Sequence, residues 1–77
     1  MRPGRDPQSP QQWRRVMAMA EACLQLDAAR QYGFVTGGPA VCVDRCVELL
    51  ERGRALGHAP TVSLIDVAVQ ALIREHA

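Results

Sequence analysis

Three cysteines are the most reactive side chains in the sequence, and two of them are spaced to share one face of a helix. Cys42 and Cys46 lie four residues apart, and Cys23 or His58 could approach them in the folded chain. Zinc requires three or four ligands in a tetrahedron, and structural sites usually supply a tighter Cys-x-x-Cys pair. The chain has one looser pair and no second pair. We therefore expect core packing of these thiols and no metal or other cofactor.

No residue pattern indicates catalysis. Nucleophilic catalysis needs a histidine beside a cysteine or serine, and neither His58 nor His76 lies in such a motif. Glu48 and Glu51 are expected on a solvated helix face. The Gly37–Gly38 pair lacks the spacing and the lysine of a phosphate-binding loop. Because a chain of 77 residues rarely encloses a substrate pocket, we expect no enzymatic activity.

The composition indicates one small globular domain rather than a disordered chain, since 48% of residues are hydrophobic and 22% are charged. No apolar run approaches the ~20 residues of a membrane span. The N-terminus has no apolar segment of the signal-peptide kind. These features predict a cytoplasmic location, in which the three thiols stay reduced.

All nine basic residues are arginine, and this bias indicates a GC-rich coding sequence of the kind found in bacteria. The net charge is +1, so no strong basic field would draw the chain to nucleic acid. The distribution is uneven, because four of the arginines lie within the first fifteen residues.

The first predicted helix runs from Pro10 to about Gln31. It follows residues 1–8, which contain Pro3, Gly4 and Pro7 and are expected to form a flexible arm. Ser9 can cap the helix, and Gln12 can complete a capping box. The expected core stripe consists of Trp13, Val16, Met17, Ala20, Cys23, Leu24 and Ala28. Met19 and Leu26 widen this apolar face, so we expect two neighbouring elements to pack on it. Gly33 is placed to end the helix in a left-handed conformation.

The second predicted helix runs from Pro39 to Leu56, with Gly57 as its C-terminal stop. Glu48 and Arg52 have the i, i+4 spacing of a weakly stabilising ion pair. Gly53 lies inside this helix, where glycine costs about 1 kcal/mol relative to alanine. A close approach of another helix would explain why glycine occurs there.

The third predicted helix, within 60–77, is apolar around most of its circumference. Such a helix must be buried on nearly all sides, so we expect it to be the centre of the fold and to mediate self-association. Ser63 followed by Asp66 is the preferred cap, and Thr61 is the alternative. Trp13 could make a binding contact, because tryptophan is enriched in binding hot spots, but we expect it in the core. The candidate partner or dimer surface is Leu64, Val67, Val69, Leu72, Ile73 and Trp13.

Together these segments predict an all-α fold over residues 9–77, a small bundle of three antiparallel helices joined by short loops that dimerises through the C-terminal helix. The favoured function is a non-catalytic bacterial adaptor or regulatory protein that acts through protein–protein contact. Its size and arginine bias would suit an accessory protein of a phage or mobile element.

An alternative places a strand over residues 40–44, because this stretch alternates loosely and is rich in β-branched residues. Asp44 would then cap a helix that starts at Arg45. The resulting order of strand, helix, turn and helix resembles the ribbon-helix-helix repressors, which implies a dimer that reads DNA with paired strands. The aspartate is unfavourable at DNA, so phosphate contacts would fall to Arg45, Arg52, Arg54 or the N-terminal arm.

A second resemblance concerns residues 56–63, which look like the turn and the start of the recognition helix in helix-turn-helix regulators. The helix that follows exposes few side chains that could read bases, chiefly Ser63, Asp66 and Gln70. Nucleic acid is therefore a possible partner of the chain but not the favoured one.

Overall fold

Three α-helices form the part of the chain that the structure, a computed structural model, describes: residues 7–31, 33 and 41–75. They are α1 (Pro10–Gln31), α2 (Val43–Ala55) and α3 (Val62–Glu75). Across these residues there is no β-strand. The predicted all-α fold is therefore confirmed. Most of the predicted arm, residues 1–6, lies outside the described residues.

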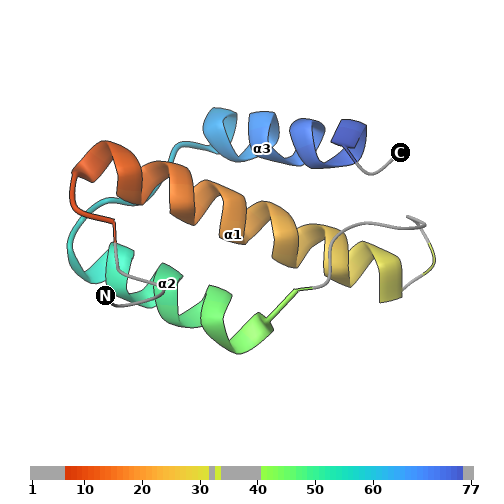
Figure 1. Ribbon diagram of the computed structural model, residues 1–77, viewed down its shortest axis with the longest axis horizontal. Coiled ribbons are helices and arrows are strands. Elements are labelled where there is room, and N and C mark those ends of the chain that lie inside the picture. Colours follow the sequence, from red (N-terminus) through yellow and green to blue (C-terminus); the bar gives the residue numbers. More distant parts are fainter. Residues whose placement is uncertain (1–6, 32, 34–40, 76–77) are drawn as a thin grey trace, which may run out of the picture.

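Helix α1 is the centre of the fold. Both α2 and α3 pack against α1, while α2 and α3 make no contact with each other in the described part of the chain (Figure 1). The three helices lie side by side, and the molecule measures 34 × 28 × 19 Å. The expectation that the C-terminal helix occupies the centre is therefore wrong. An apolar circumference indicates that a helix needs cover, but it does not determine which helix has two neighbours.

The helices do not alternate in direction as predicted. α2 runs antiparallel to α1, whereas α3 runs in the same direction as α1 (Figure 1). Residues 56–61 carry the chain from the α2 side of α1 to its other side. Helix α2 buries a stripe that includes Leu50 and Gly53 against α1. Helix α3 also packs on α1 and not on α2 in the described chain.

The start of α1 is fixed by the predicted capping box. The Ser9 hydroxyl oxygen accepts a hydrogen bond from the Gln12 backbone N–H at 3.1 Å. The Gln12 side-chain oxygen in turn accepts from the backbone N–H groups of Ser9 at 3.1 Å and Gln8 at 3.0 Å. Three backbone donors that the helix itself leaves unpaired thus have partners. The prediction that the helix begins at Pro10 is confirmed.

Two glycines end helices where the sequence predicts. Gly33 has a φ of 78° and donates its N–H to the Arg30 carbonyl at 3.0 Å. Gly57 also has a φ of 78° and donates to the Arg54 carbonyl at 3.0 Å, while the next N–H, of His58, reaches the Gly53 carbonyl at 2.9 Å. This pair of bonds is the Schellman motif, which requires a left-handed residue that glycine adopts without strain.

Helix α2 begins later than predicted. Its first residue is Val43, and Cys42 is the N-cap residue with extended backbone angles (φ −87°, ψ 95°). Val41 and Cys42 are therefore not helical, which corrects the predicted start at Pro39. The alternative strand is also wrong over Val43 and Asp44, which are helical. Asp44 lies in the first turn, where its charge meets the positive end of the helix dipole. Pro39 and Ala40 lie outside the described residues.

The cap of α3 is Thr61, not the preferred Ser63. The Thr61 hydroxyl oxygen accepts a hydrogen bond from the Leu64 backbone N–H at 3.2 Å. Ser63 lies inside the helix and is exposed. Helix α3 thus starts with Val62, two residues after Pro60.

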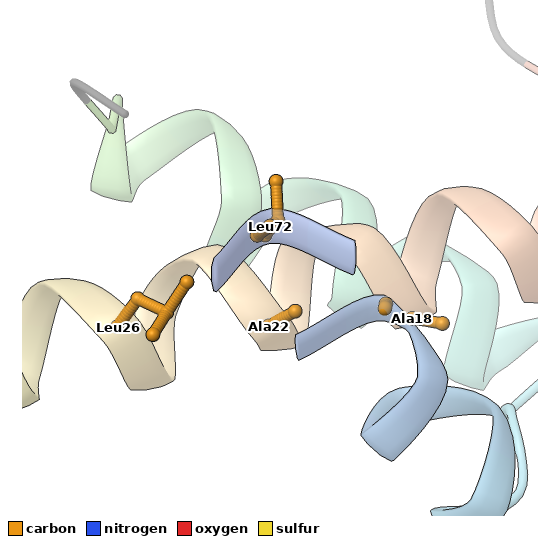
Figure 2. Close-up of a cluster of buried hydrophobic side chains, with 5 residues drawn as sticks. Ala18, Ala22, Leu26 and Leu72 are labelled. Atoms are coloured by element: carbon orange, nitrogen blue, oxygen red, sulfur yellow. The ribbon is translucent and has the colours of Figure 1, made fainter. Parts of the chain in front are cut away.

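Two separate hydrophobic clusters hold the helices together. The first, here the α2 cluster, joins α1 to α2 through Trp13, Met17, Ala20 and Leu50. The second, the α3 cluster, joins α1 to α3 through Ala18, Ala22, Leu26, Ala68 and Leu72 (Figure 2). The prediction that two neighbours pack on α1 is therefore confirmed.

The predicted core stripe of α1 corresponds mainly to the α2 cluster, although Cys23 packs beside the α3 cluster. Trp13, Met17 and Ala20 are buried, and Val16, Cys23 and Leu24 are half-buried. Ala28 is exposed, so its assignment to the core is wrong. The buried alanines that face α3, Ala18 and Ala22, were not predicted to form a contact stripe.

Candidate interaction surface

The three thiols lie near one another but are unequal in exposure. Cys46 lies one helical turn after Cys42, and its backbone N–H donates to the Cys42 carbonyl oxygen at 3.0 Å. Cys42 is exposed, whereas Cys23 and Cys46 are half-buried. Burial raises the pKa of the Cys23 thiol. Burial, followed by the neighbouring thiols of Cys23 and Cys42, raises the pKa of the Cys46 thiol. Both half-buried thiols are therefore poor nucleophiles at neutral pH, since the thiolate is the reactive form.

The other groups considered for chemistry are scattered. His58 is half-buried in the connection after α2, and Glu51 is exposed on α2. Glu48 is engaged by two arginines of its own helix. Within the described ranges, no three histidine, cysteine or acidic side chains are grouped so as to hold a metal ion. His76 and the Gly37–Gly38 pair lie outside these ranges.

The residues predicted to form a partner surface do not share one exposed face. Trp13 and Leu72 are only 5% and 6% exposed, because they are buried in the α2 cluster and the α3 cluster respectively. Neither side chain is available to a partner. This corrects the assignment of Leu72 to that surface, and for Trp13 it confirms the expected place in the core. Leu64 and Val69 are half-buried beside the α3 cluster. Val67 and Ile73 are exposed, at 62% and 40%.

Further exposed apolar side chains lie on all three helices, and sequence reasoning did not assign them to a surface. They are Met19 of α1, Val43 and Val47 of α2, Val62 of α3, and Leu56 directly after α2. The signal that could have found Met19 is its position on the widened apolar face of the first helix. Those on α2 and α3 remain exposed because each of these helices packs on α1 alone in the described chain.

The three arginines considered for phosphate contacts are all engaged by carboxylates. Arg45 forms a hydrogen-bonded ion pair with Glu48, and Arg52 Nη1 lies 3.8 Å from Glu48 Oε1. Arg54 Nη2 donates to Glu21 Oε1 at 2.9 Å, which links α2 to α1. The predicted pair of Glu48 and Arg52 is therefore confirmed. The carboxylates partly neutralise the positive charge with which these arginines would bind a DNA phosphate.

The geometry of the helix pair α2 and α3 also differs from that of a helix-turn-helix motif. In that motif two helices are joined by a turn of about three to four residues, and the second lies in the major groove. Here residues 56–61 connect α2 to α3, and these helices do not contact each other in the described chain.

Among the described residues, no helix has the combined length and apolar character that crossing a bilayer requires. Comparison of the chain with models of known families, with curated proteins and with solved structures finds no match.

Proposed function

We propose that the chain is a non-catalytic adaptor or regulatory protein of the bacterial cytoplasm, which acts through protein–protein contact as a homodimer. The observation that supports this most directly is the arrangement of the helices. Because α2 and α3 both pack on α1 and not on each other, the helices form a layer rather than a closed bundle. A layer has two broad faces, and each of the three helices exposes at least one large apolar side chain.

The exposed apolar side chains support the same proposal. Val62, Val67 and Leu56 are 74%, 62% and 57% exposed. A partner that covers one broad face would complete the burial that a third layer of structure provides in a larger domain.

The proposal is tested by measuring the molar mass of the full chain with light scattering over a concentration series. We expect a dimer whose population falls on dilution. A chain that stays monomeric at the highest concentration would contradict the proposed self-association. Circular dichroism on the same samples must report helix, so that an unfolded chain is not counted as a monomer.

The alternative is a dimeric DNA-binding regulator of the ribbon-helix-helix or helix-turn-helix kind. The observation in favour of the first is the extended backbone at Cys42, directly before α2. The pairing of Arg45 and Arg52 with Glu48 weighs against it. This alternative predicts sequence-specific DNA binding that weakens when Arg45 or Arg52 is changed to alanine. Retention on DNA that disappears at moderate salt without sequence preference would contradict it.

A further inference from the structure

The cysteine thiols of the chain lie together where α2 begins beside α1. Cys46 packs against the α2 cluster, while Cys23 of α1 packs beside the α3 cluster. Burial raises the pKa of the Cys46 thiol, and the thiols of Cys23 and Cys42 raise it further. Both other thiols must therefore lie within electrostatic range of Cys46. Cys46 thus has one thiol neighbour on α1 and another one helical turn before it.

The backbones of Cys42 and Cys46 lie at the separation that a disulfide requires. The Cys46 N–H donates to the Cys42 carbonyl oxygen at 3.0 Å, so one helical turn separates the two residues. Cα atoms one turn apart lie about 6 Å from each other, and disulfides join Cα atoms about 4.4–6.8 Å apart. Cys42 precedes the helix, with φ −87° and ψ 95°. Rotation about its backbone can therefore bring its sulfur to Cys46 while α2 stays intact.

The two thiols differ in exposure, and this difference gives each a separate role. Cys42 is exposed, and its side chain makes no capping hydrogen bond to the start of α2. An oxidant in solution can therefore reach its sulfur directly. Cys46 is half-buried, and its raised pKa keeps the thiol protonated at neutral pH. Cys42 is thus the thiol that meets an oxidant first, and Cys46 is the neighbour that can react with the product.

The chemistry available to this pair is that between the thiols themselves, because no three metal-ligating side chains are grouped to hold an ion in the described part of the chain. We propose that Cys42 and Cys46 form a redox-sensitive pair, which hydroperoxides convert into an intramolecular disulfide. Disulfides of cytosolic proteins are usually of this transient, redox-sensing kind. The modification concerns a single chain, so it does not depend on the proposed protein–protein contact.

The reaction has two steps and consumes one hydroperoxide. First, the Cys42 thiolate attacks the peroxide, so that a sulfur–oxygen bond forms and the oxygen–oxygen bond breaks. Cys42 is oxidised to the sulfenic acid, and hydrogen peroxide is reduced to water. Second, the Cys46 sulfur attacks the Cys42 sulfur, the disulfide bond forms, and the hydroxyl group leaves with the Cys46 proton as a second water. Two electrons pass from the thiol pair to the peroxide, and a dithiol reductant returns them.

The disulfide would close a ring around residues 43–45, at the exposed first turn of α2. Val43 within this ring and Val47 just after it are 44% and 41% exposed. The ring lies two to three turns from Gly53, where α2 makes its closest contact with Met17 of α1. Oxidation should therefore alter the surface at the start of α2 and leave the packing of the helices in place.

The test treats the folded, reduced full chain with hydrogen peroxide, blocks the remaining thiols with iodoacetamide, and identifies the disulfide by mass spectrometry after trypsin digestion. Trypsin cleaves after arginine, and the sequence places Cys23, Cys42 and Cys46 on different peptides, residues 16–30, 31–45 and 46–52. We expect peptides 31–45 and 46–52 to be joined, with the joined form lost after reduction. The intact chain should keep the mass of one copy, less two hydrogens, and its helix content by circular dichroism.

Three variants separate the roles of the thiols. Cys23→Ser should keep the joined peptides, whereas Cys42→Ser should lose them. In Cys46→Ser, Cys42 should stay at the sulfenic acid and be labelled by dimedone, a reagent specific for that group. Circular dichroism verifies that each variant is folded. Peptide 46–52 joined to 16–30, disulfides only between two copies, or Cys42 oxidised beyond the sulfenic acid in the wild-type chain with no disulfide would each overturn the proposal.

Discussion

Gly53 of α2 lies directly against Met17 of α1, so closely that a methyl group on Gly53 would be 2.1 Å from the Met17 sulfur and 2.9 Å from its Cγ. Met17 is fully buried and Gly53 is buried as well. Glycine inside a helix is unfavourable by itself, but here it allows the two helix backbones to approach each other. This contact explains why glycine, the residue of α2 with the lowest helix propensity, occurs at this position.

Gly53→Ala should therefore lower stability even though alanine is the better helix former. Strain from overpacking costs about 1–3 kcal/mol, and the gain in helix propensity offsets about 1 kcal/mol of it. Urea unfolding measures the difference. Adding Met17→Ala should remove most of the strain, so the two changes together should show favourable coupling. A Gly53→Ala chain more stable than wild type would mean that Met17 moves aside without cost.

Ala22→Leu should destabilise the chain by separating α3 from α1. Ala22 is 0% exposed in the α3 cluster, where its small side chain lets Ala68 and Leu72 come close (Figure 2). Inserting a larger side chain into such a contact costs about 1–3 kcal/mol. Ala28→Leu is the matched control, because Ala28 is exposed on the same helix. Thermal unfolding should show a clearly lower melting temperature for Ala22→Leu and almost no change for Ala28→Leu.

Thr61→Ala should cost about 1 kcal/mol, since it removes the acceptor of the Leu64 backbone N–H. Ser63→Ala should change stability by less than about 0.5 kcal/mol, because Ser63 is exposed and does not cap the helix. Urea unfolding of the two variants discriminates between the two capping positions. Equal losses, or a larger loss for Ser63→Ala, would place the cap at Ser63.

Cys42 should be alkylated faster than Cys23 and Cys46 in the native chain. Cys42 is exposed, whereas burial raises the pKa of both other thiols and so lowers their thiolate fraction at neutral pH. Iodoacetamide labelling followed by mass spectrometry of peptides gives the three rates. In denaturant the three rates should become similar. Faster labelling of Cys46 than of Cys42 in the folded chain would contradict the arrangement described here.

Local signals in the sequence predicted the helix ends well. Ser9 with Gln12 marked the start of α1, and Gly33 and Gly57 marked the ends of α1 and α2. Each of these signals acts through backbone groups only a few residues away, so it needs no knowledge of the tertiary fold. Gly53 also indicated a close contact between helices, although the sequence did not identify Met17 as the residue in contact with it.

The arrangement of the helices could not be predicted in the same way. Alanines such as Ala18 and Ala22 contribute little to an apolar pattern, but their small size lets α3 pack closely on α1. We expected α3, the most apolar segment, at the centre of the fold. Hydrophobicity, however, indicates how much surface a helix must bury and not how many helices pack on it. For the same reason the candidate surface combined buried and exposed residues. Leu72 and Val67 are both apolar, yet Leu72 is buried against α1 and Val67 is exposed.

The absence of contact between α2 and α3 in the described chain has a consequence for the order in which the molecule opens. Helix α3 is attached through α1 alone, by residues such as Ala22 and Ala68 that are far apart in the sequence. It can therefore detach as a cooperative unit of its own while α1 and α2 stay packed, in the manner of a foldon. Backbone amides in α3 should then exchange their hydrogens before those in the middle of α1, which both neighbours protect.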